Sequence, residues 1–249
     1  MDTALLCRAA VRVVRGEGVP ALVVRTWRFV CDVLNRIICV KRVYIYRFDL
    51  ADLDSCPTLA IPPGFETRFV ASNGDADSLA AQGYEDFRDR FLRARDSLST
   101  GAVALCAYRG ERLAHIGWVA RDFRTKWRFD DVPYPVDFER GESCLGSVFT
   151  LPEYRGRGLA SHSIRLRLEY LHSVDCLTTL AAVQTDNTAS LRALSRVGLF
   201  SRRTLLHVKL PGINYIRHVG VEEHVLMERR RAENAANTGN EEERTCADD

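Results

Sequence analysis

Residues 148–160 read Val-Phe-Thr-Leu-Pro-Glu-Tyr-Arg-Gly-Arg-Gly-Leu-Ala, and this stretch decides the fold of the chain. Its first residues are β-branched and aromatic, which is typical of a strand, and the proline that follows ends the strand because it has no N–H to donate. Gly156 and Gly158 lack Cβ atoms, so consecutive backbone N–H groups can converge on an anion where the next helix begins. Arg155 and Arg157 add positive charge there. The stretch therefore predicts a strand, a tight turn and a helix that together bind a pyrophosphate.

Two common phosphate-binding loops match this stretch poorly. A P-loop places Lys and then Ser or Thr after its last glycine, whereas Gly158 is followed by Leu159 and Ala160. A dinucleotide-binding fingerprint needs a third glycine at the position of Ser161. Both patterns are therefore weak here.

The stretch does resemble the coenzyme A (CoA) loop of the GCN5-related N-acetyltransferase (GNAT) superfamily, whose pattern is Arg/Gln-x-x-Gly-x-Gly/Ala behind Pro-x-Tyr. Residues 155–160 match every position of the loop pattern, and residues 152–154 supply the Pro-x-Tyr. Residues 187–200 resemble a second family motif, an Asn-x-x-Ser/Ala helix that ends in a Gly-hydrophobic pair. Two motifs in the family's order and spacing seldom arise by chance. The resemblance covers roughly residues 64–220.

This resemblance implies an α/β (α+β) fold, in which a mixed, mostly antiparallel central sheet splays at the cofactor site and carries helices on both faces. We expect a helical extension over residues 1–45, a strand and proline-rich linker over 46–63, and the acyltransferase domain over 64–220. The tail, residues 221–249, is polar and poor in aromatic residues, which predicts disorder from about residue 232.

The resemblance also implies how the site binds acetyl-CoA, the expected co-substrate, without a metal. The pantetheine arm would pair with backbone groups of Val148, Phe149 and Thr150, and a backbone N–H near Phe149 or Thr150 would polarise the thioester carbonyl. The pyrophosphate would lie on the amides of the loop residues Arg155, Gly156, Arg157, Gly158, Leu159 and Ala160. Asn187 and Ser190 would contact the pantetheine arm, although an asparagine here is also a common helix N-cap.

The sequence leaves the general base and the general acid open. In several family members a glutamate on the central strand deprotonates the amine, and Cys144 holds the matching position here. Glu142, two residues earlier, faces the same side of the strand and is the candidate base, with a solvated strand-end glutamate as the alternative. The family's acid is a tyrosine where this chain has Leu194, which leaves Ser195 and Tyr154 as candidate donors.

Periodicity and turn signals place the elements along the chain. Strands are expected over residues 43–50, 66–71, 102–108, 112–120, 142–150, 177–183, 200–210 and 214–219. Helices are expected over residues 4–14, 21–40, 75–84, 85–98 and 187–197, and after the loop, where Ala160, Ile164, Leu168 and Leu171 form a buried stripe. Residues 121–141 form an aromatic-rich insertion, which is either a wall of the acceptor pocket or a segment that aromatic side chains pin to the domain.

Composition limits the class of protein. The net charge of +2 is too small to indicate a nucleic-acid partner, and eight scattered cysteines indicate neither a zinc site nor a disulfide framework. No uncharged run reaches the roughly 18 apolar residues of a membrane-spanning helix, so we expect a cytoplasmic protein. The basic helices within residues 1–40 either pack on the domain or make peripheral contact with an anionic membrane.

Three functions are compatible with these observations. The first is an acyl-CoA-dependent N-acetyltransferase that transfers acetyl to a primary amine by direct attack in a ternary complex. The sequence does not identify the small-molecule acceptor. The aromatic insertion and the basic helices favour an amino sugar or a lipid-linked sugar. The second is a non-catalytic CoA-binding regulatory module, favoured by Leu194 and Cys144. The third is a nucleotide-binding protein that uses the glycine turn, and no particular oligomeric state is indicated.

Overall fold

The structure is a computed structural model that describes residues 39–91, 93–198 and 200–222. The predicted helix over residues 4–14, the predicted disorder of the tail and the hypothesis of membrane contact lie outside these residues. The predicted helix over residues 21–40 also lies outside them, except that its last two residues, Cys39 and Val40, are in a strand. Of the described residues, 39–41 and 207–215 group into one compact unit and the remainder into another. Within the smaller unit, His207 Nε2 lies 2.7 Å from Asn214 Oδ1.

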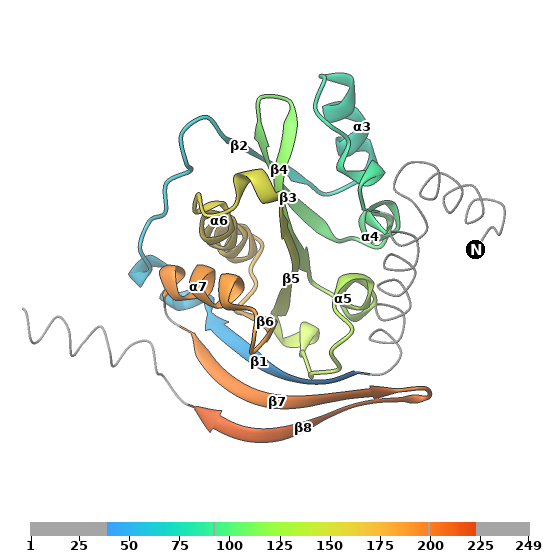
Figure 1. Ribbon diagram of the computed structural model, residues 1–249, viewed down its shortest axis with the longest axis vertical. Helices are drawn as coiled ribbons and strands as arrows, with labels where there is room; N and C mark the ends of the chain where they lie inside the picture. Colours follow the sequence, from blue (N-terminus) through green and yellow to red (C-terminus); the bar gives the residue numbers. More distant parts are fainter. Residues whose placement is uncertain (1–38, 92, 199, 223–249) are drawn as a thin grey trace, which may run out of the picture. The chain divides into compact units, whose positions relative to one another are not determined.

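One sheet of eight strands is present in the described part of the chain, in the order β2-β3-β4-β5-β6-β1-β7-β8 (Figure 1). The strands are β1 (Cys39–Asp49), β2 (Glu66–Val70), β3 (Val103–Arg109), β4 (Arg112–Ala120), β5 (Glu142–Thr150), β6 (Thr178–Gln184), β7 (Ser201–Leu210) and β8 (Ile213–Glu222). The pairs β1–β6, β2–β3, β3–β4 and β4–β5 are antiparallel, and β5–β6 is parallel. The expected mixed, mostly antiparallel sheet is therefore confirmed.

Helices cover both faces of this sheet. The α-helices are α3 (Asn73–Ala81), α4 (Ala94–Ser99), α5 (Phe123–Phe129), α6 (Leu159–Ser173) and α7 (Thr188–Val197). Short 3-10 turns are η1 (Leu50–Ser55), η2 (Phe87–Asp89), η3 (Phe138–Arg140) and η4 (Pro152–Tyr154). Figure 1 shows α6 and α7 on one side of the central strands and α3, α4 and α5 on the other. No helix within the described ranges is both long enough and apolar enough to cross a bilayer.

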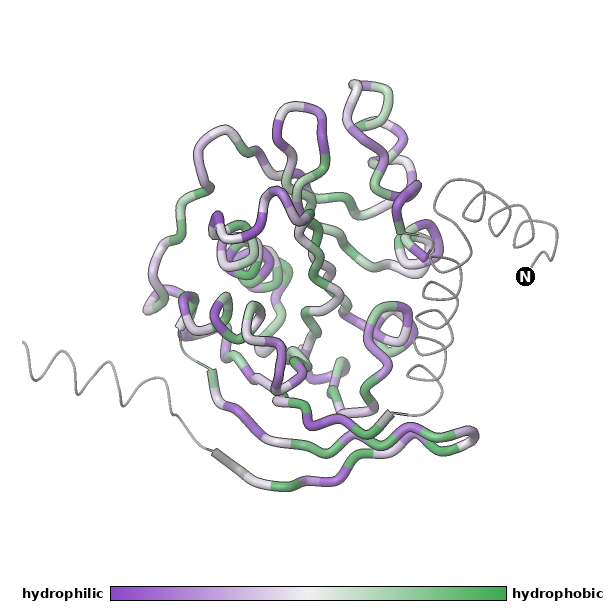
Figure 2. Tube along the Cα trace, in the orientation of Figure 1, coloured by the Kyte–Doolittle hydropathy of each residue, from purple (hydrophilic) through white to green (hydrophobic). Residues whose placement is uncertain are grey.

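The core lies on both sides of the central strands, where Figure 2 shows hydrophobic residues concentrated. Ile164, Leu168 and Leu171 of α6 pack against the sheet and are at most 5% exposed, which confirms three members of the predicted stripe, whereas Ala160 is only partly buried. The four cysteines whose side chains are described are buried, namely Cys56, Cys106, Cys144 and Cys176.

The first residues of the segment expected to contain a strand and a linker belong to strand β1 of the sheet. It pairs antiparallel with β6 from Val43 onward, well before residue 64, where the domain was expected to begin. Val43 and Ile45 are buried on one face, whereas Tyr46 and Phe48 are buried on the other. Both faces of β1 are therefore covered, and in the strand order β1 lies between β6 and β7.

The predicted helix over residues 85–98 is wrong in its first half, which forms η2 and a turn before α4. Asp86 has an extended backbone and its side chain accepts the N–H of Arg88, a local hydrogen bond that competes with helix formation. The Arg88 guanidinium is buried and forms ion pairs with Asp77 and Asp86, so η2 is held against α3. Asp77 belongs to α3, a different element from the one that contains Arg88, so a helical pattern in the sequence does not indicate this contact.

Some side chains of the aromatic insertion, residues 121–141, pack on the sheet. Tyr134 and Val132 are at most 9% exposed and belong to a cluster with strand residues. A Cβ on Gly146 of β5 would lie 2.5 Å from Phe129 Cε2, so glycine is needed where this ring approaches. Phe123 is 61% exposed. The buried members of the insertion therefore pin it to the domain, whereas Phe123 faces solvent.

Candidate functional site

Strands β5 and β6 run side by side only over their first residues. Their pairing ends at Leu145 and Ala181, although β5 continues to Thr150 and β6 to Gln184. On its other side β5 stays paired with β4 as far as His115, opposite Thr150. Among the described residues, the last part of β5 thus has one edge without a strand partner, and an extended ligand can add to such an edge.

A β-bulge accompanies this parting of the strands. Gly146 lies opposite Trp118 and Phe149 lies opposite Ile116, so β5 has one more residue than β4 between these two pairs. Ser147, in the bulge, has a φ of 44°, a left-handed conformation that is uncommon for residues other than glycine. Bulges bend a strand and interrupt its pairing, often next to functional sites.

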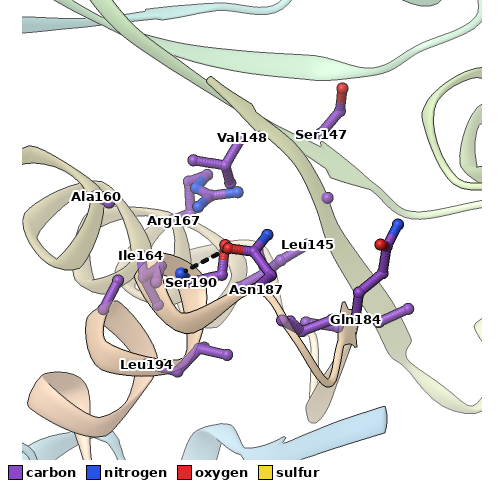
Figure 3. Close-up of a pocket in the computed structure, with 15 residues that line it drawn as sticks. Leu145, Ser147, Val148, Ala160, Ile164, Arg167, Gln184, Asn187, Ser190 and Leu194 are labelled. Carbon is purple, nitrogen blue, oxygen red and sulfur yellow. Dashed lines mark hydrogen bonds between the residues drawn. The ribbon is translucent and has the colours of Figure 1, made fainter. Parts of the chain in front are cut away.

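A cleft of about 300 Å³ opens between the parted strands and is bounded by α6 and α7 (Figure 3). The buried residues that line it form its floor, and these are Leu145, Ile164, Arg167, Ala181, Ala193 and Leu194. The less buried residues form its rim, and these include Ser147, Val148, Ala160, Gln184, Asn187 and Ser190. Apolar walls with a few polar groups at the rim are typical of a small-molecule site.

The glycine loop lies exposed at the start of α6, next to this cleft. Arg155, Gly156 and Arg157 are exposed, and Ala160 lines the cleft. Gly156 and Gly158 have φ values of 75° and 85°, and a Cβ at either position would meet no protein atom within 4 Å. The glycines are therefore required by the backbone conformation, and the space in front of the loop is open.

The first turn of α6 has no capping side chain. Gly158 is the N-cap, and no side-chain hydrogen bond caps the helix. Helix N-termini carry unpaired N–H groups and a partial positive charge, which together favour an anion. Arg155 is held nearby, because its Nε donates a hydrogen bond to the backbone oxygen of Thr150 at 3.1 Å.

Asn187 is a helix cap and a cleft residue at the same time. Its Oδ1 accepts the N–H of Ser190 at 3.1 Å, which caps α7 (Figure 3). Both residues line the cleft. The two interpretations of Asn187 from the sequence are therefore compatible, since the cap occupies the oxygen and leaves the amide nitrogen for a ligand.

The structure places Glu142 and Cys144 outside the cleft. Glu142 lines a second cavity of about 220 Å³, where it forms an ion pair with Arg47 and accepts the N–H of Asp137 at 2.8 Å. The Cys144 thiol is buried 3.5 Å from Tyr134 Oη, and burial raises the pKa of this thiol to about 12. Cys144 is therefore protonated at neutral pH, and the role of Glu142 as a base stays a prediction.

The candidate proton donors are also away from the cleft. Leu194 is part of the floor, whereas the neighbouring Ser195 is exposed and donates its hydroxyl to the backbone oxygen of Arg192 at 2.9 Å. Tyr154 packs edge-on against Phe65, with 5.6 Å between the ring centroids. Neither hydroxyl is among the groups that line the cleft, so a proton-donor role for them stays a prediction.

His115 is a buried residue beside the site that the sequence analysis did not single out. Its side chain has no exposed surface, and its Nδ1 lies 2.8 Å from Thr150 Oγ1 on β5. Burial, with smaller contributions from Arg167 and His162, lowers the pKa of His115 to about 3. The imidazole is therefore neutral at physiological pH, and it ties β4 to the end of β5.

Arg167 is the second residue beside the site that the sequence patterns did not indicate. It lies on the buried face of α6, between Ile164 and Leu168, where an apolar side chain would be expected. Its guanidinium packs on Gly117, where a Cβ would lie only 2.8 Å from Arg167 Cζ. A charged residue inside an apolar stripe, together with a glycine inside a strand, was the signal that could have revealed this contact.

The parted strands and the uncapped helix beside an exposed glycine loop are the arrangement that the resemblance to the GNAT superfamily implies. A family model described as "Acetyltransferase (GNAT) family" matches residues 72–199, just over half of the chain. The chain belongs to the GNAT acetyltransferase family. No curated protein matches it.

Several solved structures are similar to the chain. A putative GNAT acetyltransferase from Novosphingobium aromaticivorans is 19% identical over 69% of this chain and 65% of that chain, with a TM-score of 0.42. A tandem GNAT protein from the clavulanic acid biosynthesis pathway is 17% identical over 74% and 55%, with a TM-score of 0.45. The chain yncA, a putative acetyltransferase from Salmonella typhimurium with its cofactor acetyl-CoA, is 14% identical over 57% and 80%, with a TM-score of 0.38. This chain covers less than two thirds of the length of the Novosphingobium protein and of the tandem GNAT protein.

Proposed function

We propose that this chain is an acyl-CoA-dependent N-acyltransferase, in its simplest form an N-acetyltransferase, which passes the acyl group to a small-molecule primary amine by direct attack in a ternary complex. The observation that supports this function is the meeting of two features at one cleft. The free edge of β5 suits an extended amide-bearing arm, and the uncapped N-terminus of α6 suits a pyrophosphate.

The residues of β5 beyond the parting would hold the pantetheine arm through their backbone. Val148, Phe149 and Thr150 lie after the last β5–β6 pair, so their free edge can exchange hydrogen bonds with the amides of the arm. At the rim, Asn187 and Ser190 would contact the same arm from α7. Side-chain identity matters little on the strand, but it matters at Asn187, where the amide nitrogen is the available donor.

The loop residues Arg155 to Ala160 would hold the pyrophosphate. The open space in front of Gly156 and Gly158 fits a group that approaches the backbone closely. Arg155 and Arg157 are exposed at the same loop and add charge that favours an anion. This donor set of amides and guanidinium groups suits phosphate oxygens and contains no carboxylate.

Acyl transfer needs a polarised carbonyl and a way to remove one proton from the amine. The bound thioester supplies a carbonyl carbon to which the amine nitrogen bonds as the C–S bond breaks and the sulfur leaves as the CoA thiolate. Backbone N–H groups near Phe149 and Thr150 would stabilise negative charge on the carbonyl oxygen. No carboxylate or imidazole of the described residues lines the cleft, so we assign the surplus proton to water. Glu142 acts as the base only for an acceptor bound in the second cavity.

A non-catalytic CoA-binding module is the second candidate, and two observations favour it. Cys144 stands where several family members have a basic glutamate, and its buried thiol stays protonated at neutral pH. Leu194 stands where the family has its acid tyrosine, and it contributes only apolar surface to the cleft floor. Neither change affects the groups proposed to hold CoA.

An acceptor screen distinguishes these functions. We expect acetyl-CoA to release thiol only when an amine is present, and we expect an amino sugar or a lipid-linked sugar with a primary amine to gain the mass of an acetyl group. The screen should also contain amino acids, small amines and peptides, with each product identified by its mass shift. CoA binding without thiol release across the whole panel would favour the module. Tighter binding of ATP or NAD than of CoA, measured by calorimetry, would contradict both candidates.

A further inference from the structure

One charged side chain, Arg167, is present among the described residues that line the cleft. It belongs to the floor and has no exposed surface. Its Nε donates to the backbone oxygen of Ser163 at 3.1 Å, and its Nη1 donates to the backbone oxygen of Trp118 at 3.0 Å. The Nη2 atom is buried and has no hydrogen-bond partner among the residues that the structure describes.

No negative charge compensates this guanidinium in the described part of the chain. No carboxylate there affects the pKa of Arg167, which burial alone lowers to about 9. The nearby polar groups are the imidazole of His115 and the hydroxyl of Ser163, and both of these are also buried with an unpaired atom. Neither group carries a negative charge at neutral pH.

Such an arrangement is costly to folding. A buried charge without a charged partner loses its hydration, and two backbone carbonyls compensate for that loss only in part. Methionine or leucine would fit the apolar stripe of α6 at this position without that cost. The unpaired Nη2 therefore calls for a group that the chain itself does not supply, and the cleft is where such a group could arrive.

We propose that Arg167 determines acyl-group specificity by binding a carboxylate at the end of the acyl chain, so that the preferred donor is a dicarboxylic acyl-CoA of the malonyl or succinyl class. This inference rests on the proposed function. Residues proposed to hold the arm, such as Val148 and Asn187, line the same cleft as Arg167, so a short acyl chain can extend from the rim to the floor. The carboxylate supplies both the missing charge and the acceptor for Nη2.

The acetyl group of acetyl-CoA would leave Nη2 without a charged partner. A longer acyl chain with a terminal carboxylate would form a charge-assisted hydrogen bond in an environment shielded from water, where such bonds are strong. Because Arg167 is covered when the cleft holds no ligand, a floor side chain must turn aside as the acyl chain enters. The competing possibility is that Nη2 binds a buried water or an uncharged carbonyl, and the experiment below distinguishes it.

Calorimetry on the full chain tests the inference with four ligands: CoA, butyryl-CoA, malonyl-CoA and succinyl-CoA. We expect malonyl-CoA or succinyl-CoA to bind about tenfold or more tightly than butyryl-CoA, which has an uncharged chain of similar length. The variant Arg167→Met should lose this preference and keep the wild-type affinity for CoA, and Arg167→Gln should behave in the same way if the first variant folds poorly.

Two outcomes would overturn the inference while leaving the proposed function intact. One is CoA binding with no preference among the acyl chains, which would indicate a water or an uncharged partner at Nη2. The other is a preference that survives in the Arg167 variants. Failure of the wild-type chain to bind CoA at all would instead contradict the proposed function, and this inference would fail with it.

Discussion

Replacing Gly158 by valine is expected to weaken CoA binding by more than about tenfold, which corresponds to more than about 1.4 kcal/mol. Gly158 has a φ of 85°, and the space that a Cβ would enter contains no protein atom within 4 Å. That space is where the pyrophosphate is proposed to approach the loop amides. The side chain would therefore compete with the ligand, and a β-branched residue would also disfavour the left-handed backbone that aims these amides. Calorimetry with CoA measures the effect.

Gly64→Val is the matched control for this substitution. Gly64 has a φ of 78°, and a Cβ there would also meet no protein atom within 4 Å. It does not line the cleft. Both variants should lose stability by a similar amount in thermal unfolding, because both place valine in a left-handed conformation, but only Gly158→Val should lose CoA affinity. Equal affinity for CoA in the two variants would contradict the proposed position of the pyrophosphate.

Stability is expected to fall more steeply in acid for the wild-type chain than for the variant His115→Asn. Burial lowers the pKa of His115 from 6.5 to about 3, so the folded chain keeps a neutral imidazole throughout this interval. The unfolded chain binds a proton there, and lowering the pH from about 6.5 towards 3 therefore favours unfolding. Between about pH 7.5 and about pH 5 this difference amounts to on the order of 2 kcal/mol.

Urea unfolding of both proteins at these two pH values measures the difference. Asparagine can retain the hydrogen bond to Thr150 Oγ1 and has no group that titrates in this range. Carboxylates elsewhere contribute equally to both chains and cancel in the comparison. If acidification lowers the free energy of unfolding of the two proteins equally, His115 does not remain neutral in the fold, which would contradict its burial on β4.

The glycine loop and its strand could be predicted from the sequence because their signals are local. Gly156 and Gly158 were expected in a tight turn that leaves its backbone N–H groups accessible, and both lie in such a turn before α6, with positive φ. The hairpin of β3 and β4 and the buried stripe of α6 likewise follow from turn chemistry and periodicity over a few residues. These features depend on neighbours in the chain, which the sequence displays directly.

Features that depend on distant residues could not be predicted in this way. The place of β1 in the sheet is set by β6, more than a hundred residues later, and nothing near Val43 reveals that partner. Glu142 is held by Arg47 of β1, so its cavity could not be inferred from the strand period alone. The contact of Arg167 with Gly117 also joins two elements whose spacing along the chain carries no periodic signal.

Hydrogen–deuterium exchange with and without saturating CoA tests the central claim most directly. If the diphosphate lies on the amides at the start of α6 and the arm lies on the free edge of β5, CoA should slow exchange in peptides that cover residues 146–150 and 155–161. Exchange in α3, residues 73–81, which contributes no residue to the cleft lining, should stay unchanged. CoA that binds while exchange in both peptides stays the same, or slows only elsewhere in the chain, would contradict the account.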